Sequence, residues 1–290
     1  MRLHRRVPPL AAVALVAALV VAGSGTNTHE RGPGHAPAST FFGQSPPEST
    51  AQLLAPTVLV GEAHDSPVFS SDGQWFFLHG MDVDVLFYGM VDGELAVIDS
   101  PLSIEFPQVC NGMAISPSGD RLYVEEWRDG RNHIKYADRR GEGWTSFTEI
   151  DLGIEGSPWQ MSVASDGDVY VSSGGIVVRV PEGGRSGPVP LRLEDGREMA
   201  GDTPSVSPDE EVLLCSIEGN LHISYRRDDG AWTVPIELGP DVNSDQLDLC
   251  PQLTPGGEYL VFVSRRLSPE FRVFWAEAGF VEALRPEELD

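Results

Sequence analysis

The hydrophobic positions of this chain occur in short runs separated by polar turns, and the same arrangement occurs five times. The clearest copy is residues 66–78, SPVFSSDGQWFFL, where two apolar runs flank a Ser-Asp-Gly turn. Glycine accepts a positive φ and an aspartate hydrogen-bonds its own backbone, so this pattern predicts a hairpin. The aligned turns end at intervals of 46, 48, 43 and 47 residues, at Gly73, Gly119, Gly167, Glu210 and Gly257.

Each repeat contains more than one hairpin. A third apolar run follows in every repeat, as in NHIKYAD and LHISYRR, and three repeats add a glycine turn and a fourth run. A period of about 45 residues with four short strands is typical of a propeller blade. No apolar stripe at helical spacing is present in the sequence. The sequence therefore predicts an all-β chain folded as a β-propeller. Five blades are favoured, and six would require an unrecognised repeat that includes residues 40–60.

The ends of the repeat array predict how the ring closes. The fifth repeat lacks a fourth strand, because only the short run FVEAL follows it. Residues 55–60, APTVLV, form an apolar run that belongs to no blade. If this N-terminal strand joins the last blade as its outer strand, it joins the two ends of the ring and removes an exposed strand edge.

The N-terminus has the pattern of an export signal. Arg2, Arg5 and Arg6 precede thirteen apolar residues at 10–22, and small residues follow at 23–25. We expect a signal peptide over 1–25, a flexible linker over 26–50 and the propeller over 51–290. An uncleaved N-terminal anchor is the alternative, although the apolar run is shorter than the roughly 20 residues of a membrane-spanning helix. The expected location is periplasmic or secreted, with no stable membrane span once the signal is removed.

Net charge limits the expected partners, and cysteine content limits the expected metal sites and disulfides. The formal net charge is −24 at neutral pH, so nucleic acid is not an expected partner. Cys110, Cys215 and Cys250 are odd in number and widely spaced, and they do not predict a zinc site. They fit either buried free thiols or one disulfide, for which Cys215 and Cys250 are the preferred pair because they lie in neighbouring repeats.

In a propeller, the loops that lead into the innermost strands meet at one mouth of the central channel. The candidate ligand-binding residues are those that the repeats place there: His64, Asp65, Asn111, Trp159, Gln160, Asp202 and Asp248. Trp159 has no equivalent in the other repeats, so it is the aromatic candidate for stacking on a sugar or peptide. No cofactor is predicted. Asp65, Asp202 and Asp248 are an alternative set of oxygen ligands for a cation such as calcium.

The histidines allow two interpretations. His64 next to Asp65 is either a general base or a loop histidine that bonds to its neighbour. His79, His133 and His222 lie in or beside predicted strands, and we expect them to be packing or surface residues. The sequence contains no nucleophile elbow, zinc-binding HExxH helix or P-loop.

Several turns resemble a known repeat. PVFSSDGQWFFL, AISPSGDRLYV, SVSPDEEVLLCS and QLTPGGEYLVFVSRR are similar to the WD40-like PD40 repeats of TolB-type β-propellers. The resemblance covers about residues 55–280, and it departs from the family pattern at Glu210, which replaces a glycine. It implies an exported bacterial propeller, in a family whose members are commonly binding scaffolds or domains attached to enzymes.

The sequence therefore predicts an exported, non-enzymatic propeller. Its expected partner is an envelope or extracellular protein, a peptide or a glycan, bound at the channel mouth. One alternative is a polysaccharide-acting hydrolase or lyase with acid/base residues at that mouth. A second alternative is a purely structural envelope module.

Overall fold

A computed structural model describes residues 41–47, 50–80, 85–107, 110–182 and 187–289. The predicted signal peptide and most of the predicted linker lie outside these residues. The described part of the chain is nearly all β, with one short α-helix, α1 (Phe280–Ala283), and one 3-10 turn, η2 (Glu287–Leu289). None of its helices is long and apolar enough to cross a membrane.

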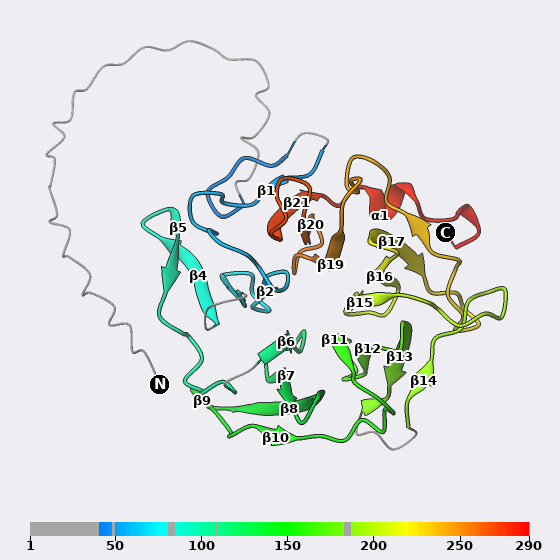
Figure 1. Cartoon of the computed structure of the whole chain (residues 1–290), viewed down its shortest axis with the longest axis horizontal. Helices are drawn as coiled ribbons and strands as arrows, with labels where there is room; N and C mark the ends of the chain where they lie inside the picture. The colour runs from blue at the N-terminus through cyan, green and yellow to red at the C-terminus, as the bar shows by residue number, and fades with distance from the viewer. Residues whose placement is uncertain (1–40, 48–49, 81–84, 108–109, 183–186, 290) are drawn as a thin grey trace, which may run out of the picture. The chain divides into compact units, whose positions relative to one another are not determined.

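Five antiparallel sheets surround a central axis as the blades of a β-propeller, which confirms the predicted fold and blade count (Figure 1). Blade A contains β2 (Val68–Phe69), β3 (Trp75–Leu78), β4 (Leu86–Val91) and β5 (Glu94–Ile98). Blade B contains β6 (Cys110–Ile115), β7 (Arg121–Arg128), β8 (Arg131–Arg140) and β10 (Thr148–Glu149), and β9 (Gly143–Trp144) also pairs with β8.

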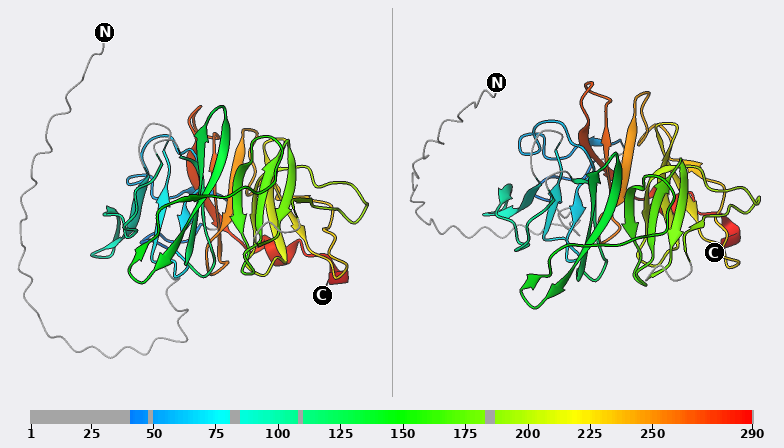
Figure 2. Two further views of the ribbon diagram at one scale, coloured as in Figure 1. Left: turned by 90° about the horizontal axis from the view of Figure 1, so that it is seen from below. Right: turned by 60° about the horizontal axis from the view of Figure 1, so that its bottom comes forward.

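The other three blades repeat this order. Blade C contains β11 (Trp159–Val163), β12 (Val169–Ser173), β13 (Ile176–Val180) and β14 (Val189–Pro190). Blade D contains β15 (Asp202–Val206), β16 (Val212–Ile217), β17 (Asn220–Tyr225) and β18 (Ile236–Glu237). Blade E contains β19 (Asp248–Leu253), β20 (Tyr259–Ser264), β21 (Arg272–Glu277) and β1 (Gln52–Leu53). The side views in Figure 2 show the strands of neighbouring blades standing next to one another around the ring.

An N-terminal strand closes the ring, as predicted, but it is not the expected segment. The closing strand is β1, which pairs antiparallel with β21 through Gln52↔Trp275 and Leu53↔Phe274. The run 55–60 forms a turn instead of a strand. Ala55 has φ 41°, and its carbonyl accepts hydrogen bonds from the N–H groups of Val58 and Leu59 at 2.9 and 2.8 Å. Its apolar residues are explained by packing, because Ala55 and Leu59 belong to a buried cluster between blades A and E.

The repeated turns connect the two inner strands of each blade, as the sequence predicts. In blade A the Ser70 hydroxyl donates to Asp72 Oδ1 at 2.7 Å and accepts from the N–H of Trp75 at 3.2 Å. The N–H of Gly73 donates to the carbonyl of Ser70 at 2.9 Å, with a φ of 66° at the glycine. Serine, aspartate and glycine therefore shape the backbone at this turn.

The hydrophobic core of the described residues is divided into five clusters, and each lies between two adjacent blades. Phe76 and Trp275 pack together between blades A and E, and Tyr170 and Trp232 pack between blades C and D. These four side chains are at most 2% exposed. Because each blade buries its faces against its neighbours, the stability of the ring depends on closure.

Candidate functional site: the channel mouth

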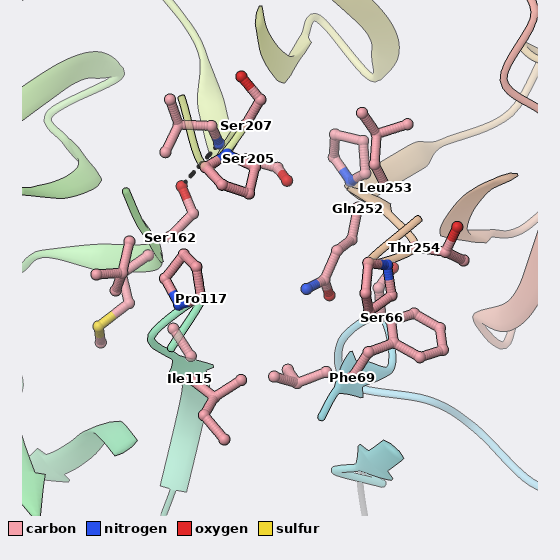
Figure 3. A pocket seen from close by; sticks show the side chains of 18 of the residues that line it. Ser66, Phe69, Ile115, Pro117, Ser162, Ser205, Ser207, Gln252, Leu253 and Thr254 are labelled. Atoms are coloured by element: carbon pink, nitrogen blue, oxygen red, sulfur yellow. Dashed lines mark hydrogen bonds between the residues drawn. The ribbon is translucent and has the colours of Figure 1, made fainter. Parts of the chain in front are cut away.

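The five innermost strands surround a central cavity of about 360 Å³. These strands are β2, β6, β11, β15 and β19, and their residues line the cavity from Asp65 at one end to Pro255 at the other. Figure 3 shows Phe69, Ile115, Ser162 and Gln252 around its open centre. The wall combines apolar side chains with hydroxyl and amide groups, so it can contact both apolar and polar parts of a ligand.

The two ends of the channel differ in chemistry. At one end lie the turns between the first and second strand of each blade. At the other, which we call the mouth, lie the loops that lead into the innermost strands and the loops that join the second and third strands. The mouth contains most of the residues that the sequence predicts as ligand-binding.

A backbone irregularity recurs at the mouth. Gln160, Thr203 and Cys250 occupy equivalent positions in blades C, D and E, with φ values of 51°, 51° and 54°. Each lies where the register between the first two strands shifts. Non-glycine residues rarely adopt positive φ, and bulges of this kind re-aim side chains at barrel rims and next to active sites. The bulges therefore give the mouth a side-chain arrangement that differs from the regular strands below it.

Five of the predicted residues meet at the mouth. Asp65 is at the centre, with its Oδ1 atom 3.1 Å from His64 Nδ1 and accepting a hydrogen bond from Gln160 Nε2. The same Gln160 nitrogen donates to the carbonyl of Asn111 at 3.3 Å. The rings of His64 and Trp159 have centroids 6.0 Å apart. Blades A, B and C thus contribute to one polar group, which we call the mouth cluster: His64, Asp65, Asn111, Trp159 and Gln160.

The other two predicted residues have different partners. Asp202 accepts a hydrogen bond from the Ser172 hydroxyl at 2.7 Å. Asp248 is fully buried, and it accepts hydrogen bonds from the Ser244 hydroxyl and from Arg266, both at 2.8 Å. Two groups of described residues bring three ligand atoms within 4.8 Å of one another, and the set of Asp65, Asp202 and Asp248 is not one of them. The carboxylates that were an alternative for calcium therefore do not converge in this structure.

A buried acid in the second strand of blade B was not anticipated from the sequence. Glu125 is fully buried, and Asn132 Nδ2 donates to its Oε2 atom at 3.2 Å. A Cβ atom added to Gly112 would lie 2.8 Å from the Glu125 carboxyl carbon, so only glycine fits above this group. Burial, with the negative charge of Asp65 as a second cause, raises the pKa of Glu125 well above its ordinary value. These two causes favour the protonated form of Glu125 beside the mouth cluster.

His79 also joins the mouth, although the sequence suggested a packing or surface role. The His64 N–H donates to the His79 carbonyl at 2.8 Å, and Ala63 pairs with Gly80 as an isolated bridge. This pairing brings the two imidazole rings to a centroid distance of 5.0 Å. Burial lowers the pKa of His64, but its contact with Asp65 and the charges of Asp65 and Glu62 outweigh burial, so the pKa stands above its ordinary value.

All three cysteines are free thiols in this structure. Burial, together with nearby carboxylates, raises the pKa of Cys110 and of Cys215 to about 12, and burial raises the pKa of Cys250 well above its ordinary value. Because the thiolate is the reactive form, we expect the folded protein at pH 8 to react with Ellman's reagent more than about 100-fold more slowly than the denatured protein. Denaturation should then release three reactive thiols. Detection of a single thiol after denaturation would show that a disulfide is present.

Comparison with known proteins bears on the fold. No protein-family model matches the sequence, and no curated protein matches it. Among solved structures, a gluconolactonase from Xanthomonas campestris is similar with a TM-score of 0.50 and 17% identity, covering 79% of this chain and 86% of that one. A putative TolB from Agrobacterium tumefaciens has a TM-score of 0.44 and 21% identity, covering 69% of each chain. TolB from Acinetobacter baumannii has a TM-score of 0.42 and 15% identity, covering 72% of this chain and 53% of that one. Likeness at this level of identity concerns the fold alone.

Proposed function

We propose that this chain is an exported propeller that binds a protein or peptide across the channel mouth. The observation that carries the proposal is the position of exposed apolar side chains. Five large apolar residues with more than a third of their surface exposed lie in or beside the mouth loops: Val60, Trp127, Trp159, Leu247 and Leu267. They are half of the ten exposed large apolar residues in the described part of the chain. Exposed apolar groups next to polar groups that can orient a ligand are typical of a protein-binding surface.

The topology explains why these residues gather there. Val60, Trp159 and Leu247 lie in or at the end of segments that lead into the innermost strands of blades A, C and E. Trp127 lies near the end of β7, and Leu267 lies in the loop between β20 and β21. Antiparallel strands return to the same edge after every second strand, so both kinds of loop open at the mouth.

The sequence patterns fit this role and form part of the proposal. We infer that the five hairpins are PD40 repeats and that residues 1–25 direct the chain to the periplasm or the exterior. The resemblance of the turns to PD40 repeats and the charged, then apolar, N-terminus support these two inferences.

Replacing Trp159 with alanine should weaken ligand binding by about 10-fold or more, because exposed tryptophans at the centre of an interface contribute most to affinity. Peptides selected from a random phage-displayed library on the wild-type protein provide the probe, and fluorescence anisotropy measures their affinity. The matched control is Val97→Ala on the outer strand β5, where Val97 is 55% exposed and away from the mouth. Equal affinity of the selected peptides for the wild-type protein and Trp159→Ala would contradict this site.

A polysaccharide-acting hydrolase or lyase is the second candidate. It is favoured by the 3.1 Å contact between His64 Nδ1 and Asp65 Oδ1, which is the arrangement of an imidazole oriented by a carboxylate. A screen of the purified protein against glycans and aryl glycosides separates the two candidates. Turnover that disappears in His64→Ala would favour the enzyme.

A further inference from the structure

Three potential metal ligands converge at the mouth. His64, Asp65 and His79 each offer a ligand atom, and these atoms lie within 4.8 Å of one another. Their positions are set by the backbone, because the hydrogen bond from the His64 N–H to the His79 carbonyl joins the two segments that carry the imidazoles. The arrangement therefore comes from the fold of blade A and not from a chance meeting of flexible side chains.

The carboxylate of Asp65 is buried, and one of its two oxygen atoms lacks a hydrogen-bond partner. Asp65 is 6% exposed, and its Oδ2 atom has no hydrogen-bond partner. Among the ion pairs between described residues, the partner of Asp65 is His64. A buried carboxylate in this state is unfavourable unless a cation or donor compensates it.

We propose that His64, Asp65 and His79 bind a divalent transition-metal ion, with Zn²⁺ the expected ion. Two imidazoles and one carboxylate are typical ligands of zinc and related metals, whereas calcium prefers oxygen ligands alone. Ligands about 2 Å from an ion lie at most about 4 Å from one another, so small side-chain rotations are sufficient to close the site. Three protein ligands also leave a coordination position for water or a ligand group at the mouth.

A second group of convergent side chains differs from this one in the residues that compensate its charge. Asp166, Asp168 and Glu210 also bring ligand atoms within 4.8 Å of one another. Arg179 pairs with Asp168 and Glu210, and Arg226 pairs with Glu210, so arginines already compensate that charge. The group of His64, Asp65 and His79 has imidazoles in place of arginines, and imidazoles are themselves metal ligands.

Isothermal titration with ZnCl₂ tests the site on the full chain after treatment with a chelator and removal of any affinity tag. We expect one Zn²⁺ per chain, with affinity about 100-fold or more lower in His79→Ala and Asp65→Asn, because each loses one ligand. The matched control is His222→Ala in blade D, whose imidazole contacts the Asn220 carbonyl at 3.0 Å, and its affinity should be unchanged. Zn²⁺ should raise the melting temperature of the wild-type protein and of His222→Ala but not of the two ligand variants.

Less than one bound Zn²⁺ per chain, or full affinity in both ligand variants, would overturn the proposal. Calcium binding at the same site with equal affinity would also overturn it. Circular dichroism without metal verifies that the variants fold. The visible absorption of the Co²⁺ complex of the wild-type protein tests nitrogen ligation without any variant, and absence of the bands of an imidazole-ligated complex would count against it. This proposal does not depend on the proposed peptide binding, because Trp159→Ala should retain Zn²⁺ affinity.

Discussion

Replacing Leu54 with alanine should lower the free energy of unfolding by about 3 kcal/mol, as large-to-small substitutions in packed cores do. Leu54 follows the closing strand directly and is 1% exposed in the cluster between blades A and E. Its N–H donates to the Val273 carbonyl at 3.0 Å, so the side chain is held at the junction where the two ends of the ring meet. Guanidinium chloride unfolding followed by tryptophan fluorescence measures the effect.

The matched control lies six residues further along the same segment. Val60 is 73% exposed, and Val60→Ala should change the free energy of unfolding by less than about 0.5 kcal/mol. If both variants unfold at the wild-type denaturant concentration, the N-terminal segment does not contribute to ring closure. That result would show that the packing of Leu54 between blades A and E does not stabilise the ring.

The hairpin turns were predictable because their chemistry is local. Ser70, Asp72 and Gly73 bond to one another or to the adjacent backbone, so a short stretch of sequence is sufficient to specify the turn. Recurrence of that signal at a regular period then indicates blades, and the count of signals gives five. Closure by an N-terminal strand follows from counting strands, without any knowledge of side-chain contacts.

The closing strand itself was not predictable from local pattern. Residues 55–60 are apolar and resemble a strand, whereas β1 has only two residues and one of them, Gln52, is polar. Which residues pair is decided by the position of the free edge of β21, which is a tertiary property. Propensity is therefore overridden at this segment, and the apolar run serves packing instead.

The mouth residues were likewise predictable only in part. The topology alone brings His64, Asp65 and Gln160 together, because the loops into the innermost strands share one end of the channel. Side-chain direction is not available from topology, and a bulge of one residue changes it. The repeat alignment therefore places Asp202 and Asp248 at the mouth, whereas in the structure their side chains bond to Ser172 and Arg266.

Two mouth residues were missed for different reasons. Glu125 lies in the run RLYVEEW, and an acid inside a strand that is otherwise apolar was a usable signal of a buried polar site. His79 offered no such signal, since its meeting with His64 depends on the isolated pairing of Ala63 with Gly80. Such a pairing has no sequence pattern of its own.

The departure from the repeat pattern at Glu210 has a structural explanation. Glu210 occupies the glycine position of its turn with φ 60°, a strained conformation for this residue, and it is only 7% exposed. Its carboxylate accepts a hydrogen bond from the Tyr170 hydroxyl at 2.6 Å. It also pairs with Arg226 of its own blade and lies 3.3 Å from Arg179 Nε of blade C. The side chain therefore links blades C and D at the cost of backbone strain.

We expect Glu210→Gly to lower the free energy of unfolding by about 2 kcal/mol, although it restores the repeat pattern. Removing one partner from a buried charge network costs about 3–5 kcal/mol, and we take the lower end because both arginines are 32% exposed and partly screened by solvent. Relief of strain at φ 60° returns about 1 kcal/mol. Equilibrium unfolding in guanidinium chloride, evaluated at several protein concentrations, measures the net effect.

Gly257→Ala isolates the strain contribution. Gly257 is the equivalent residue of blade E, with φ 76° and no neighbouring atom within 4 Å of an added Cβ, so its substitution should cost about 1 kcal/mol through backbone strain alone. Glu210→Gln keeps the φ value and the side-chain volume but loses the charge, and we expect it to lie between the wild-type protein and Glu210→Gly. If Glu210→Gly is more stable than the wild-type protein by the amount that Gly257→Ala loses, strain alone decides this position. The contacts to Tyr170, Arg179 and Arg226 would then contribute nothing to holding blades C and D together.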